Sequence, residues 1–88
     1  MKTIKLNVAN IQTVKALHIY LAYMLDLPAY YGRNLDALHD VLSEESEPIH
    51  ILLSGMPNSE EMMAYLPKLE CVLSDCAQEN DKICFERV

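Results

Sequence analysis

The most constraining feature of this 88-residue chain is a short apolar segment at residues 49–53, with the sequence IHILL. Pro48 precedes the segment, and Gly55 and Pro57 follow it. A near-continuous apolar run of this length is typical of a central β-strand covered on both faces, as in parallel sheets. Parallel strands are joined by crossover connections that usually contain helices. The segment therefore predicts an α/β fold built around a buried central strand.

Two further patterns predict the other strands of the sheet. Ile4, Leu6 and Val8 alternate with polar residues, which is the period of a half-buried strand over residues 3–8. Near the end of the chain, residues 83–85 (ICF) predict a third strand.

Apolar residues at helical spacing occupy the segment between the first two strands. One helix is predicted from about residue 13 to residue 25, with Thr13 or Asn10 as its N-cap. A second helix is predicted to begin after Asn34 and to run to about residue 44.

Two more helices are predicted between the second and third strands. Asn58 or Ser59 is expected to cap a short helix, and Pro67 is expected to begin another that runs to Cys76. The predicted order is βααβααβ, a three-stranded parallel sheet with right-handed crossovers packed against about four helices. The length suits a single domain over residues 1–88.

The charge of the chain limits the partners that it is expected to bind. Seven lysines and arginines stand against thirteen aspartates and glutamates, which gives a net charge of −6. Direct binding of nucleic acid is not expected, because that affinity comes largely from cationic contacts to phosphate. An anionic membrane surface is disfavoured for the same reason, and no apolar stretch is long enough to cross a bilayer.

The three cysteines, Cys71, Cys76 and Cys84, predict a reducing environment, and no signal-peptide pattern opens the chain. A cytoplasmic location is therefore expected. No histidine lies at a zinc-finger spacing from the cysteines, which are expected to be small core residues. The sequence predicts no metal site and no cofactor.

Acidic residues are concentrated in the middle of the chain, where residues 34–67 contain seven of them and no lysine or arginine. On the helix after Asn34, the side chains of Asp36, His39 and Asp40 fall within an arc of about 100°, opposite the apolar stripe. Like charges four residues apart destabilise an isolated helix by about 0.2–0.5 kcal/mol. Glu44 extends the column toward the negative end of the helix, where acids are unfavourable. This face is a candidate for binding a cationic partner, and a solvated face is the alternative.

Residues 27–42, LPAYYGRNLDALHDVL, resemble the signature loop and second helix of the barstar family, the intracellular inhibitors of barnase-type secreted ribonucleases. The pattern Leu-Pro-x-Tyr-Tyr-Gly-x-Asn-Leu-Asp-Ala-Leu-x-Asp-x-Leu is present without a gap. The rest of the chain agrees in element order and length, and His18 stands where the family has a histidine. The resemblance implies a barstar-like fold and a protein that inhibits an enzyme and catalyses nothing itself.

The resemblance also implies a binding surface, because in the barstar family this loop and helix plug the ribonuclease active site. Asp40 matches the aspartate that enters the phosphate-binding pocket, Asp36 the neighbour that meets a basic side chain, and Tyr30 the tyrosine that packs on the catalytic histidine. The implied partner is a basic secreted ribonuclease of the barnase type, and the free protein is expected to be a monomer. The predicted partner-binding residues are Tyr30, Gly32, Asn34, Leu35, Asp36, His39, Asp40 and Glu44.

The chain departs from the family pattern at two places. His39 stands where barstar has a tryptophan, and residues 43–48 (SEESEP) are one residue shorter than in barstar and replace a second interface tryptophan with acid. Aromatic anchors are typical hot spots, so a cognate ribonuclease other than barnase is expected. The acidic residue that barstar contributes from its last helix aligns near Gln78 or Glu79.

Two other functions are compatible with the same residues. A barstar-like domain whose inhibitory role has drifted would serve as an interaction module for another basic protein. An enzyme would use Asp36 and Asp40 as Mg²⁺ ligands and His39 as a base. The enzyme is disfavoured because only two carboxylates of one helix converge and the chain has no glycine-rich phosphate loop.

Overall fold

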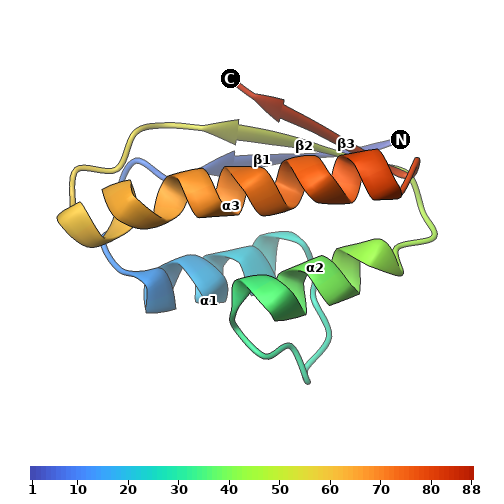
Figure 1. Cartoon of the computed structure of the whole chain (residues 1–88), viewed down its shortest axis with the longest axis horizontal. Helices are drawn as coiled ribbons and strands as arrows, with labels where there is room; N and C mark the ends of the chain where they lie inside the picture. Colours follow the sequence, from blue (N-terminus) through green and yellow to red (C-terminus); the bar gives the residue numbers. More distant parts are fainter.

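The computed structural model describes all 88 residues and contains three strands and three helices (Figure 1). The strands follow the order of the chain across a parallel sheet, so that β2 lies between β1 and β3. The elements are β1 (Lys2–Asn7), α1 (Val14–Met24), α2 (Leu35–Ser43), β2 (Ile49–Ser54), α3 (Glu60–Glu79) and β3 (Ile83–Arg87). The predicted α/β class and three-stranded parallel sheet are confirmed.

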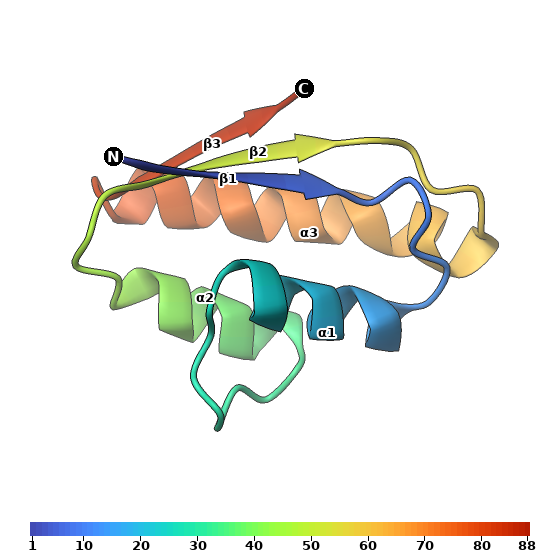
Figure 2. The same cartoon turned by 180° about the vertical axis from the view of Figure 1, so that it is seen from behind.

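All three helices lie on one side of the sheet (Figures 1 and 2). α3 packs against β3 and α1 against β1, whereas α2 packs against α3. Ile49, Ile51 and Leu53 of β2 point toward the helices and are buried, whereas His50 and Leu52 point the other way and are half-buried. The expectation that the central strand is covered on both faces is therefore wrong. His50 and Leu52 are partly exposed because no element of the chain packs over that face of the sheet.

The predicted βααβααβ order with four helices is also wrong, because residues 60–79 form the single helix α3 with Pro67 inside it. Pro67 is exposed, and the backbone N–H that it lacks would have bonded the carbonyl of Met63. An interior proline costs about 3 kcal/mol, and burying one large apolar side chain contributes about 1.5–3 kcal/mol. Buried side chains continue at helical spacing on both sides of the proline. Their burial outweighs the cost of placing a proline inside the helix. This buried stripe consists of Met62, Leu66, Leu69, Leu73 and Cys76.

Side-chain caps fix where the helices begin. Thr13 Oγ1 accepts a hydrogen bond from Ala16 N at 3.1 Å, and Ser59 Oγ accepts one from Met62 N at 3.1 Å. The N-cap of α1 is therefore Thr13 and not Asn10. The N-cap of α3 is Ser59 and not Asn58.

Of the three cysteines, only Cys76 is a core residue. Cys71 and Cys84 are exposed, so the expectation that all three are small core residues is wrong. Cys71 lies on the outer side of α3 and Cys84 on the open face of the sheet, positions that alternate with buried neighbours.

Candidate partner-binding site

A buried histidine attaches the loop between α1 and α2 to the core. The ring of His18, on α1, has no exposed surface, and its Nδ1 and Nε2 lie 2.6 Å from Tyr31 Oη and 2.8 Å from Tyr65 Oη. Burial lowers the pKa of His18 and raises those of both tyrosines, so all three groups are neutral at pH 7. A neutral imidazole donates through one nitrogen and accepts at the other, which matches two hydroxyl partners. His18 is therefore a structural residue.

Tyr30 and Tyr31 are adjacent but differ in burial. Tyr31 is buried against His18, whereas the side chain of Tyr30 is 82% exposed. The loop that carries them projects from the helical side of the molecule, away from the sheet (Figures 1 and 2). The ring of Tyr30 is thus in solvent, where it is available to a partner.

Local hydrogen bonds fix the end of this loop and the start of α2. Asn34 is the N-cap, and its Oδ1 accepts from Ala37 N at 2.7 Å while its Nδ2 donates to the Gly32 carbonyl at 3.3 Å. The positive φ in this turn belongs to Arg33 (58°), so Gly32 is not needed for backbone freedom. A Cβ at Gly32 would lie 3.3 Å from Ala37 Cβ, which shows that close packing against α2 favours glycine here.

The carboxylates of α2 are exposed, as the sequence predicts, whereas His39, which was predicted on the same face, is half-buried. Leu38 and Leu42 are buried in the core, whereas Asp36, Asp40 and the C-cap Glu44 are exposed. Leu35 is half-buried and packs against the core. Two buried leucines thus fix the rotation of the helix and keep its carboxylates in solvent.

A recess of about 260 Å³ lies between the loop and α2. Asp40 supplies its only carboxylate, and the exposed ring of Tyr30 forms one wall. The lining residues are Tyr30, Tyr31, Gly32, Ala37, Asp40 and Val41. The recess therefore offers an aromatic face and an acid to a small cationic or imidazole side chain.

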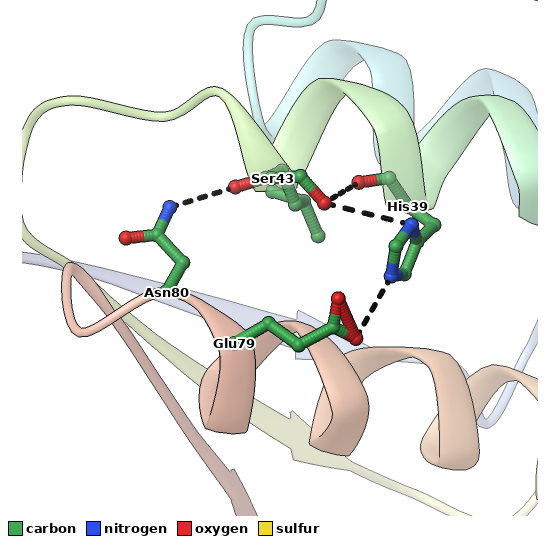
Figure 3. A network of polar contacts seen from close by, with 5 residues as sticks. His39, Ser43, Glu79 and Asn80 are labelled. Carbon is green, nitrogen blue, oxygen red and sulfur yellow. Dashed lines mark hydrogen bonds and ion pairs between the residues drawn. The ribbon is translucent and has the colours of Figure 1, made fainter.

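His39 points toward α3 and not toward the recess. Its Nε2 lies 3.1 Å from Glu79 Oε2, and its Nδ1 lies 3.5 Å from Ser43 Oγ (Figure 3). The hydrogen bond to Glu79 and the charges of Glu79, Asp40 and Asp75 raise the pKa of His39, although desolvation opposes them. The imidazole therefore binds its proton more tightly than a free histidine does.

Asn80, the C-cap of α3, joins the ends of α2 and α3. Its Nδ2 donates to the carbonyls of Leu42 and Glu45, both at 3.0 Å. Figure 3 shows the Asn80 side chain reaching the end of α2 and draws one of these two bonds. Glu45 N also donates to the Leu42 carbonyl, at 3.3 Å, so Asn80 adds a second donor at the end of α2. The backbone of Glu79 is thereby held beside α2.

The structure brings some of the predicted residues together and separates others. Tyr30, Gly32 and Asp40 line one recess, and His39 lies beside it on α2. Asp36, Asn34, Leu35 and Glu44 lie on the same helix or at its ends but do not line the recess.

Sequence reasoning left Glu79 unplaced and missed Asn80. The available signal was helical periodicity, because Glu79 follows the buried Cys76 by three residues and so lies at the edge of the buried stripe of α3. No such pattern points to His39 as the partner of Glu79, since 40 residues separate the two along the chain.

Two structural findings bear on other functions. None of the helices combines the length and hydrophobicity needed to cross a membrane. No three side chains among the histidines, cysteines, aspartates and glutamates are grouped so that they could hold a metal ion.

The chain was compared with known proteins. None of the curated proteins matches it. The family described as barstar, barnase inhibitor, matches residues 1–87, which is nearly the whole chain. The family's inhibitory role agrees with a chain predicted to have no catalytic activity. The loop with its paired tyrosines, the capped acidic helix and this match lead to one conclusion: the chain belongs to the barstar family.

Proposed function

We propose that this protein inhibits a barnase-type ribonuclease by covering its active site with the loop of residues 27–34 and the outer face of α2. The observation that carries the proposal is the recess in which the exposed ring of Tyr30 stands beside the Asp40 carboxylate. A site that binds RNA phosphate is rich in arginine, lysine and histidine. An acidic helix held rigidly by the core therefore meets complementary charge.

Each residue of this surface has a role in the proposal. Asp40, beside the recess, takes the position of an RNA phosphate and pairs with cationic groups of the active site. Asp36, one turn earlier and exposed, pairs with a basic side chain nearer the rim. Tyr30 packs its ring on the catalytic histidine of the enzyme, which would enter the recess.

The remaining predicted residues act around these three. Asn34 and Gly32 present backbone groups of the tight turn before α2, and Leu35 contributes apolar contact at its start. Glu44 extends the negative potential at the end of the helix. Contacts at the rim contribute mainly to the association rate, and contacts at the centre mainly to the lifetime of the complex.

The cognate enzyme is proposed to differ from barnase. His39 and the acidic segment 43–48 stand where the barstar family has two tryptophans, and His39 is engaged with Glu79. A partner selected by aromatic anchors would lose those contacts, whereas one with additional basic residues opposite α2 and α3 would gain charge pairs.

The proposal is tested by titrating the protein into purified barnase-type ribonucleases while RNA cleavage is followed. Inhibition of one of them that is complete at a one-to-one molar ratio is the expected result for a monomeric inhibitor. The alternative, an interaction module for another basic protein, is favoured by the same loss of aromatic anchors. If every ribonuclease still cleaves RNA at its full rate when this protein is present in large molar excess over the enzyme, inhibition is rejected.

A further inference from the structure

Two carboxylates from different elements act on His39. Asp40 follows it on α2, and Glu79 is in the last turn of α3. The imidazole contacts Glu79 through Nε2 at 3.1 Å, which joins the acidic face of α2 to the end of α3 (Figure 3). The pair remains accessible, because the side chains of His39 and Glu79 are 35% and 56% exposed.

The surroundings of the imidazole favour its doubly protonated form. Ser43 Oγ–H donates to the His39 carbonyl at 2.7 Å, which leaves a lone pair of Oγ toward His39 Nδ1 at 3.5 Å. Both ring nitrogens therefore face acceptors. The charged groups that act on the ring are Asp40 on its own helix and Asp75 and Glu79 on α3, and all three are acidic.

The position of Glu79 is fixed from both ends. Its backbone is held by Asn80, which donates to two carbonyls at the end of α2, and its carboxylate is held by His39. An exposed glutamate without such contacts would sample many rotamers, and ordering it on binding would cost free energy. Preorganisation by His39 removes that cost.

We propose that His39 is a positioning and specificity-determining residue of the ribonuclease-binding surface, which holds the Glu79 carboxylate in line with Asp40 and releases its own proton when a cationic partner binds. This inference rests on the proposed function. The partner that it specifies carries an arginine or lysine opposite Glu79, at the end of the interface where an aromatic anchor is absent. The histidine thus couples the choice of partner to pH.

The sign of the pH dependence follows from linkage. In the free protein the surrounding carboxylates raise the pKa of His39 above its ordinary value of 6.5. A cationic side chain brought to Glu79 repels the imidazolium and lowers that pKa in the complex. Affinity therefore rises as pH increases from the pKa in the complex to the pKa in the free protein, by about tenfold for each unit between them.

The coupling of the pair is tested first in the free protein, by NMR titration of the His39 ring in the wild type and in Glu79→Gln. The pKa of His39 is expected to fall in Glu79→Gln, because the largest cause of its elevation is removed. Glu86→Gln is the matched control, since Glu86 makes the corresponding 2.8 Å contact with His50 on the open face of the sheet. An unchanged His39 titration in Glu79→Gln would overturn the inference and leave the proposed function standing.

The effect on binding is tested with the inhibited ribonuclease, by measuring affinity between pH 5.5 and 8 for the wild type, His39→Gln and His50→Gln. The wild type and His50→Gln are expected to bind several-fold more tightly at pH 8 than at pH 5.5, and this part of the dependence is expected to be absent from His39→Gln. The number of protons released on binding can be measured calorimetrically in buffers of different ionisation enthalpy. This number should be smaller for His39→Gln than for the wild type.

The outcomes separate the two proposals. Inhibition with the same pH dependence and proton release in His39→Gln as in the wild type would overturn the role of His39 alone. Failure of the wild type to inhibit any ribonuclease would reject the proposed function and, with it, the role of His39 in binding.

Discussion

Tyr31 Oη lies 2.6 Å from Nδ1 of the buried His18, and this contact ties the partner-facing loop to the core of the protein. Tyr30, which precedes Tyr31, is exposed. The His18 contact therefore belongs to the folding of the protein, while the exposed ring of Tyr30 belongs to the proposed binding surface.

Protonation of His18 is expected to destabilise the fold. Burial lowers the pKa of His18 below 6.5 in the folded protein, so the unfolded chain binds more protons as pH falls below that value. The His18 contribution to the free energy of unfolding is therefore complete above pH 6.5 and declines below it. Denaturant unfolding of the wild type and His18→Gln across this range checks this, because the variant should lose that part of the pH dependence. Identical pH profiles would show that His18 does not titrate differently on folding.

Replacing Pro67 is expected to stabilise the protein. Pro67→Ala restores a backbone N–H inside α3, and little packing is lost because Pro67 is exposed. The free energy of unfolding should therefore rise by about 1–3 kcal/mol. Lys68→Ala, at the next exposed position, serves as the control and should change stability by less than about 0.5 kcal/mol. A loss of stability in Pro67→Ala would mean that α3 needs the proline for its packing.

The bond between the helix ends is expected to contribute to stability. Asn80→Ala removes two hydrogen bonds to the carbonyls of Leu42 and Glu45 and a third that Asn80 Oδ1 accepts from Lys82 N, and it should lower the free energy of unfolding by about 1–3 kcal/mol. Gln78→Ala, an exposed amide in the same turn, is the control and should have little effect in thermal or denaturant unfolding. If both variants lose the same stability, the contact of Asn80 with α2 does not account for the loss.

Local patterns in the sequence predicted much of the fold. The strands follow from alternation and from the apolar run at 49–53, and α2 follows from Asn34 and the buried pair Leu38 and Leu42. These features depend on residues a few positions apart, which is why one sequence suffices to see them.

Features set by distant contacts were not predictable in this way. Pro67 reads locally as the start of a helix, and only the packing of residues on both sides against the sheet keeps α3 continuous. The uncovered face of β2 depends on where the helices pack, and the pairing of His39 with Glu79 depends on the approach of α2 to α3. In each case tertiary contacts overrode or supplemented the local preference.

The most direct test of the acidic surface compares the affinities of Asp40→Ala and Glu60→Ala for an inhibited barnase-type ribonuclease. Asp40 lines the recess beside Tyr30, whereas Glu60 begins α3 at the end of that helix far from Glu79. Removing a central carboxylate that pairs with a desolvated cation is expected to weaken binding by at least about 30-fold, and removing a peripheral one by less than about threefold. Equal losses in the two variants would contradict the assignment of the binding surface to α2 and its preceding loop.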